Sequence, residues 1–143
     1  MMIETDILYA YVKPQDWLKP VATKLIQKIE NGSLGVVYVS REVLHELYYV
    51  SMEEGISIDE FITRAASITA VKNLIFIETD HTIDLLAFTL VRQYNLTSIF
   101  DAYYAATALN KVPDRTIIST DNIFDKIPGI KRVDPRHLLK SNI

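Results

Sequence analysis

Short apolar runs rich in β-branched residues alternate along this chain with longer segments whose apolar residues recur at helical spacing. The runs that we expect to form strands lie at 1–3, 34–39, 74–77, 115–119 and 130–133. Strands that alternate with helices in this way favour a layered α/β fold with a largely parallel sheet. Ligands bind such sheets beyond the carboxyl ends of the strands, so a functional site is expected there.

The helices between these strands are predicted by apolar stripes and by capping residues. The second helix is expected to carry a single apolar stripe formed by Trp17, Val21, Leu25 and Ile29. Polar residues predict where later helices begin, namely at Ser40, Ser57, Thr79 or Asp80, and Ser98. The strand at 74–77 is expected to be buried, because all of its residues are apolar.

The length of 143 residues predicts one domain spanning residues 1–143, and the apolar fraction of 49% is enough for a full core. No apolar run is long enough to span a membrane, and residues 1–6 show no secretory signal pattern. The absence of cysteine excludes disulfides, zinc–thiolate sites and thiol nucleophiles. We therefore expect a soluble cytoplasmic protein with no membrane partner.

The net charge of −3 is unevenly distributed. Residues 1–110 carry 8 Lys and Arg against 14 Asp and Glu, whereas residues 111–143 carry 7 against 4. An acidic chain is not an obvious nucleic-acid binder, because phosphate contacts need cations. The basic residues of the C-terminal part form either a local phosphate-facing patch or an ordinary solvated surface; they are Lys126, Lys131, Arg132, Arg136 and Lys140.

A carboxylate in the first turn of an expected helix is the most informative side chain. Asp101 stands three residues after Ser98 and is followed by a run of small alanines. It has two explanations: it closes a capping box at the positive end of the helix, or it belongs to a metal-binding cluster assembled from distant segments.

Four other carboxylates stand at comparable places. Glu46 borders an apolar helix face. A glutamate there either has a partner that offsets the burial of its charge, or lies at the rim with its carboxylate in solvent. Glu4 and Asp6 follow the first strand, and Asp121 follows the strand that ends at Ser119; each of these three also fits an ordinary cap or turn. These carboxylates indicate a site only when they are taken together, because a parallel sheet brings the carboxyl ends of its strands to one edge.

Carboxylates that share one cleft repel one another unless a divalent cation neutralises them. All-oxygen ligands indicate Mg²⁺ or Mn²⁺, and two such ions can activate a water for phosphoryl displacement. Other chemistries lack their motifs: the chain has no dinucleotide fingerprint, Walker A loop or nucleophile elbow, and no HExxH spacing among its three histidines. The tyrosine pairs at 48–49 and 103–104 are interpreted as core or dimer packing.

Four short motifs together resemble the PIN-domain family, which includes the toxin nucleases of VapBC systems. They are the segments at 3–8, 43–47, 101–108 and 119–124, in the order seen in that family. The resemblance implies a three-layer α/β fold, with a central mostly parallel sheet flanked by helices. It also implies a Mg²⁺- or Mn²⁺-dependent endoribonuclease that acts on RNA, a small antitoxin partner and a homodimer.

Carried over by motif, the catalytic and metal-binding acids are Glu4, Glu46, Asp101 and Asp121, with Ser119 as a supporting hydroxyl. The chain departs from the family pattern at Glu4, where aspartate is usual. The extra methylene displaces the carboxylate by about a bond length, and a displacement of order 1 Å costs on the order of 100-fold in rate. Asp6 lies close enough in sequence to replace Glu4 as the metal-binding acid, but two residues further along the chain its side chain is expected to point in a different direction.

Two rival interpretations remain open at this level. The first is a catalytically weakened PIN-like domain that binds RNA or a protein. The second is a phosphoacceptor regulatory domain, which also places acids at strand ends but expects a lysine just after the last strand. The sequence after residue 130 contains no clear match to that lysine pattern.

Overall fold

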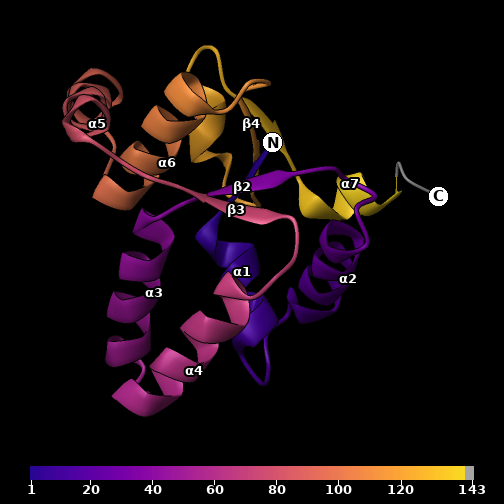
Figure 1. The fold of residues 1–143 in the computed structure, drawn as a ribbon. Coiled ribbons are helices and arrows are strands. Elements are labelled where there is room, and N and C mark those ends of the chain that lie inside the picture. The colour runs from indigo at the N-terminus through magenta and orange to yellow at the C-terminus, as the bar shows by residue number, and fades with distance from the viewer. Residues whose placement is uncertain (141–143) are drawn as a thin grey trace.

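Five short parallel strands form the centre of the protein (Figure 1). A computed structural model describes residues 1–140; residues 141–143, which the sequence-based domain prediction includes, lie outside the described residues. The strands are β1 (Met2–Ile3), β2 (Val37–Ser40), β3 (Leu74–Ile77), β4 (Thr116–Ile118) and β5 (Lys131–Val133). Every pairing is parallel, so the expected mostly parallel sheet is parallel throughout the described residues.

Seven α-helices and one 3₁₀ helix connect and cover the described strands. They are α1 (Thr5–Val12), α2 (Lys19–Glu30), α3 (Glu42–Glu53), α4 (Ile58–Thr69), α5 (His81–Tyr94), α6 (Ile99–Lys111), η1 (Asn122–Lys126) and α7 (Pro135–Lys140). In Figure 1, α1 to α4 lie below the sheet and α5 and α6 above it. The predicted three-layer α/β architecture is therefore confirmed.

The strand order β3-β2-β1-β4-β5 places a reversal in the centre of the sheet. From β1 the chain builds outward to β2 and β3, and then returns to add β4 and β5 on the other side of β1. Ligands of open α/β sheets bind at such a reversal, beyond the carboxyl ends of the strands. In this chain, that point lies between the ends of β1 and β4.

Most helix starts follow the expected capping chemistry. The Asp80 carboxylate accepts hydrogen bonds from Thr82 N and Ile83 N, so α5 begins after Asp80 rather than Thr79. The Ser57 hydroxyl accepts from Glu60 N at the start of α4. At α3 the expected cap is wrong by one residue: Arg41 occupies the N-cap position without a side-chain cap, although the Ser40 hydroxyl accepts from Glu42 N at 3.3 Å. Side-chain oxygens thus satisfy amide groups that a helix leaves without a partner.

Two expectations about apolar residues are wrong. Trp17 lies outside α2, which begins at Lys19 with Pro20 in its first turn, and its side chain is 70% exposed. The strand β3 lies at an edge of the sheet, and Ile75 is 46% exposed rather than buried. Both residues fit the apolar pattern of the expected helix or strand. Their side chains are nevertheless exposed, because the neighbouring helices and strands leave much of their surface uncovered.

The core extends across both faces of the sheet, and α6 contributes its run of small residues to it. Ala102, Ala105, Ala106 and Ala108 are all fully buried, and α6 packs along α5. Small side chains allow close approach between neighbouring elements, so α6 and the Asp101 that it carries are held firmly. No helix within residues 1–140 combines the length and the hydrophobicity needed to cross a membrane.

Phe124 allows the packing beneath η1 to be tested. Its ring is fully buried, so Phe124→Ala should lower the free energy of unfolding by about 3–5 kcal/mol through lost burial and a residual cavity. Phe88 provides the matched control, because its ring is 52% exposed and Phe88→Ala should cost less than about 1 kcal/mol. Urea unfolding measures both values; equal losses would contradict the described core.

Candidate functional site

Carboxylates from four separate segments meet at the carboxyl ends of β1 and β4. Glu4 and Asp6 belong to the junction of β1 and α1, whereas Asp121 lies in the junction of β4 and η1. Glu46 comes from α3 and Asp101 from the first turn of α6. Besides burial, the charges of Asp6 and Glu46 raise the pKa of Glu4, and those of Asp121, Glu46 and Asp6 raise the pKa of Asp101. The structure therefore brings together all the acids that the sequence analysis selected.

Glu4 is the most buried acid of this group, with 6% of its surface exposed. Its carboxylate accepts a hydrogen bond from the Ser119 hydroxyl at 2.9 Å. Burial raises the pKa of Glu4 well above its ordinary value, and the negative charges of Asp6 and Glu46 raise it further. Glu4 therefore holds a proton at neutral pH more readily than an exposed glutamate does.

Asp6 lies beside Glu4, contrary to the expectation that its side chain would point elsewhere. Its carboxylate is within hydrogen-bonding reach of the Glu4 carboxyl group. Asp6 Oδ2 also accepts hydrogen bonds from Thr120 N at 3.0 Å and from the Thr120 hydroxyl at 2.5 Å. Because Glu4 is still extended and α1 begins at Thr5, the bend in the chain turns both acids toward Ser119 and Thr120.

Glu46 is oriented by a buried tyrosine. The Tyr104 hydroxyl donates to Glu46 Oε1 at 2.9 Å and accepts from the Thr5 hydroxyl at 2.7 Å. Burial and the Glu46 charge raise the pKa of Tyr104 far above its usual range, so the phenol stays neutral and keeps donating. The Tyr104 hydroxyl is therefore the hydrogen-bond donor that offsets the partial burial of the Glu46 carboxylate.

Tyr104, Thr5 and Thr120 are site residues that the sequence analysis missed. The expectation that Tyr104 packs in the core is correct for its ring, which is fully buried, but not for its hydroxyl. One signal was available: Tyr104 follows Asp101 by three residues, which places both on the same face of α6. For Thr5 and Thr120, the sequence contained no comparable signal.

Asp101 does not close a capping box, which was one of the two explanations that its sequence position allowed. The Ser98 hydroxyl accepts from Phe100 N at 3.2 Å, but within residues 1–140 the Asp101 side chain has no hydrogen-bond partner. Burial, then the charges of Asp121, Glu46 and Asp6, raise the pKa of Asp101 to about 7. An acid that is buried without a donor and repelled by other acids is typical of a functional site.

Asp121 keeps the ordinary turn that its sequence predicts. Its Oδ1 accepts from Ile123 N at 3.0 Å, which caps η1, and its own N–H donates to the Ser119 hydroxyl at 2.9 Å. Ser119 therefore links Asp121 to Glu4 through a single hydroxyl. The exposed carboxylate of Asp121 still acts on Asp101, whose pKa it raises.

The donor set of this cluster suits a hard divalent cation. All of its groups are carboxylates, and their repulsion is the kind that Mg²⁺ or Mn²⁺ relieves. No three His, Asp or Glu side chains in the described part of the chain stand at the spacing of a formed metal site, however. The residues fit such an ion in chemistry, and an ion bound here would compete with a proton for Glu4, whose pKa is raised.

Comparisons with known proteins give a family match and a fold match. The family model described as the PIN domain matches residues 1–130. A crystal structure of VapC20 from Mycobacterium tuberculosis, a toxin that cleaves the sarcin-ricin loop, is similar at 18% identity with a TM-score of 0.69, over 87% of this chain and 92% of that one.

Two further solved structures are similar in the same way. VapBC2 from Rickettsia felis, bound to a promoter DNA fragment, has 16% identity and a TM-score of 0.67, over 92% of this chain and 96% of that one. A toxin-antitoxin complex from Klebsiella pneumoniae has 18% identity and a TM-score of 0.62, over 94% and 96%. No curated protein sequence matches. At identities this low, the structural likenesses show a shared fold.

The raised pKa of Asp101 predicts how its contribution to stability depends on pH. A folded pKa of about 7 against an ordinary value of 3.8 means that folding favours the protonated acid. This contribution is fully present below about pH 4 and is lost as the pH rises through 7. In EDTA, the unfolding free energy of Asp101→Asn relative to wild type should therefore increase between pH 4 and pH 8.

Taking the difference in unfolding free energy between Asp101→Asn and wild type removes the contributions of acids that both proteins share. One of these is Asp134, whose pKa is lowered. Urea unfolding at a series of pH values gives the measurement. A difference that stays constant from pH 4 to pH 8 would show that Asp101 is an ordinary exposed acid.

Proposed function

This chain belongs to the PIN-domain family, and on that premise we propose that it is a Mg²⁺- or Mn²⁺-dependent endoribonuclease. One observation carries the proposal: acids from distant segments meet at the reversal point of the sheet, where burial and mutual repulsion raise the pKa values of Glu4 and Asp101. A cluster of this kind stores unfavourable charge that a divalent cation would relieve. A bound divalent cation can activate water for hydrolysis of an RNA phosphodiester, so this chemistry requires no nucleophilic side chain.

In this proposal, Glu4, Asp101 and Asp121 hold the metal, and Glu46 completes its shell or orients the attacking water. The bound ion would lower the pKa of a water molecule and stabilise the negative charge that develops on the phosphate. Ser119 and the neutral Tyr104 act as positioning residues, because their hydroxyls donate to Glu4 and Glu46. The hydroxyl of Thr120 has the same role toward Asp6.

We also propose that the chain is the toxin of a toxin-antitoxin pair, acting in the cytoplasm as a single domain. The similar proteins support this, since one is a toxin and two are described as toxin-antitoxin assemblies. A small antitoxin and a second copy of the chain are the partners. The exposed aromatic rings of Tyr48 and Tyr49 offer apolar area for a homodimer.

A second candidate function is a PIN domain that binds RNA or a protein without efficient cleavage. Two observations favour it. Glu4 replaces the aspartate usual for the family and is drawn into a carboxyl pair with Asp6. The acids in residues 1–140 also lack the spacing of a formed metal site.

Asp101→Asn provides the direct test of the nuclease proposal. The change keeps the size of the side chain and removes its charge, so Mn²⁺-dependent cleavage of RNA should fall about 100-fold or more. Asp59→Asn is the matched control, because Asp59 is exposed in the first turn of α4, away from the cluster. Cleavage is followed on end-labelled RNA with EDTA blanks; full activity of Asp101→Asn would refute the assignment.

Glu4→Asp distinguishes the nuclease from the weakened domain. If the native site is impaired, restoring the shorter side chain should raise cleavage by about 10-fold or more, because a misplacement near 1 Å costs on that scale. If wild type cleaves RNA and Glu4→Asp cleaves it no faster, the result favours a nuclease whose site works with glutamate at position 4. No cleavage by either protein, at any Mn²⁺ concentration that leaves the fold intact, favours the binding module.

A further inference from the structure

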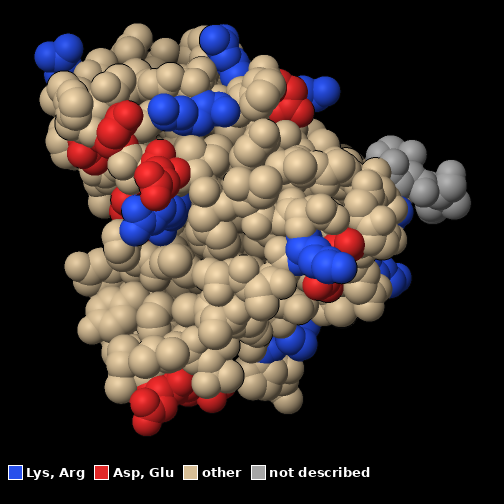
Figure 2. All heavy atoms as spheres, in the orientation of Figure 1, with Lys and Arg blue, Asp and Glu red and all other residues tan. Residues whose placement is uncertain are grey.

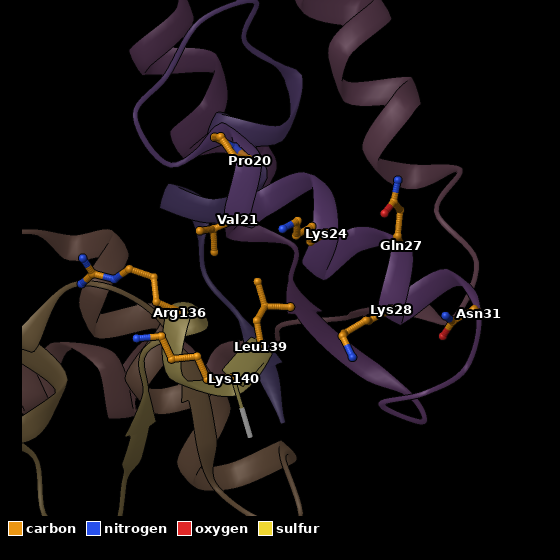
Figure 3. Close-up of a pocket in the computed structure, with 9 residues that line it drawn as sticks. All are labelled: Pro20, Val21, Lys24, Gln27, Lys28, Asn31, Arg136, Leu139 and Lys140. Atoms are coloured by element: carbon orange, nitrogen blue, oxygen red, sulfur yellow. The ribbon is translucent and has the colours of Figure 1, made fainter. Parts of the chain in front are cut away.

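A groove lies between α2 and α7, outside the acid cluster (Figure 3). Its volume is about 660 Å³, and part of its wall is apolar, formed by Val21 of α2 and Leu139 of α7. In Figure 3, Val21 and Leu139 point toward each other across the opening, whereas Arg136 and Lys140 extend to the left of it. The groove is large enough to accept part of an extended polymer.

The charged side chains that line this groove within residues 1–140 are all basic. Lys24 and Lys28 extend from α2, Arg136 and Lys140 extend from α7, and no acid among the described residues lines the opening. Arg136 is held by two hydrogen bonds to the Asp134 carboxylate, at 2.9 and 2.7 Å. The three lysines have no ion-pair partner within residues 1–140, although the net charge of the chain is −3.

The surface view places this charge in its surroundings. Figure 2 shows Lys and Arg side chains at the right of the molecule, in the region of α2 and α7. Acidic side chains lie at the lower end, where the turn between α3 and α4 carries the exposed Glu53 and Glu54, and also at the upper left and beside basic side chains at the right. The attraction of a polyanion therefore depends on the lysines that line the groove itself.

An exposed tryptophan adjoins the groove through Arg136. Trp17 is the only tryptophan of the chain, and 70% of its surface is exposed. The Arg136 guanidinium lies 5.5 Å from the centre of the indole ring, which is the distance of a cation–π contact. A flat aromatic ring beside cations is the combination on which single-stranded nucleic acids stack.

The structure also sorts the basic residues that the sequence analysis left open. Arg132 is taken up by Asp125, which accepts two of its hydrogen bonds, and Lys126 and Lys131 do not line the groove. Arg136 and Lys140 do, together with Lys24 and Lys28 from a distant part of the sequence. The basic lining of the groove therefore comes from two helices rather than from one C-terminal run.

We propose that the groove between α2 and α7 binds a single-stranded segment of RNA, with its phosphates on Lys24, Lys28 and Lys140 and a base stacked on Trp17. The proposal rests on RNA as the substrate of the proposed function, and adds a binding surface separate from the acids. An acidic protein segment would pair with the lysines too. It would not supply the planar base that the Trp17 ring accommodates, so the observations favour RNA.

Fluorescence of Trp17 tests the stacking step. A 12-nucleotide oligoadenylate is titrated into the protein in EDTA, so that cleavage cannot interfere, and Trp17 emission should be quenched as the complex forms. In parallel anisotropy titrations with fluorescein-labelled RNA, Trp17→Ala should weaken binding about 10-fold. Trp17→Phe, which keeps a stacking ring, should stay within about 3-fold of wild type.

Substitution of the lysines tests the phosphate contacts. The triple variant Lys24→Gln, Lys28→Gln, Lys140→Gln should bind the RNA about 10-fold more weakly, and the slope of log Kd against log salt should fall by about 2. The matched control removes the same charge from three other exposed lysines, Lys72, Lys126 and Lys131. It should leave affinity within about 2-fold of wild type.

Asp101→Asn separates this proposal from the nuclease proposal, because it should abolish cleavage and leave RNA binding in EDTA intact. Equal losses in the two triple variants, or RNA binding without quenching of Trp17, would overturn the groove assignment. A competing result would come from an oligoglutamate peptide. If that peptide quenches Trp17 emission and loses affinity for the groove variants, while the RNA shows neither effect, the proposal is also overturned. That outcome would assign the groove to an acidic protein segment.

Discussion

Repulsion among carboxylates at the ends of β1 and β4 is the constraint on which the site depends. Glu4 is almost fully buried and Asp101 is half-buried, yet each faces other acids. Burying like charges together is unfavourable, so the surrounding fold must hold them in place. The parallel sheet and the closely packed α6 provide that support, and the hydroxyls of Ser119, Thr120 and Tyr104 offset part of the cost.

The glutamate at position 4 changes how this repulsion is relieved. Its carboxyl group reaches Asp6, whose negative charge adds to the effect of burial in raising the pKa of Glu4. The positions of the acids are consistent with a cation site, and a bound cation would oppose the rise in the pKa values of Glu4 and Asp101. Competition between a proton and a metal ion for Glu4 is the property that separates the nuclease from the weakened binding domain.

Much of the fold follows from the sequence, because the residues that decide it act locally. Runs of β-branched residues predict all five strands, and Asp80 and Ser57 predict helix starts through contacts two or three residues away. Trp17 was assigned wrongly, because helical spacing continues through it although the chain turns before Lys19. Spacing alone does not reveal where a neighbouring element stops covering a side chain.

The site was predictable as a set of acids but not as a geometry. The pairing of Glu4 with Asp6 depends on a bend at Thr5 and on a loop more than a hundred residues away. Tyr104 joins the site through its hydroxyl, while its ring has the core environment that its pattern predicts. The groove between α2 and α7 likewise joins distant residues, so no linear motif contains it.

In the proposed function, these acids bind a divalent cation in spite of the raised pKa of Glu4. The most direct measurement is anomalous diffraction from a crystal soaked in Mn²⁺ at neutral pH. We expect an anomalous peak enclosed by Glu4, Glu46, Asp101 and Asp121, with Glu4 separated from Asp6. A soaked crystal that diffracts well and shows no peak among these side chains, or shows one only elsewhere on the protein, would contradict the claim.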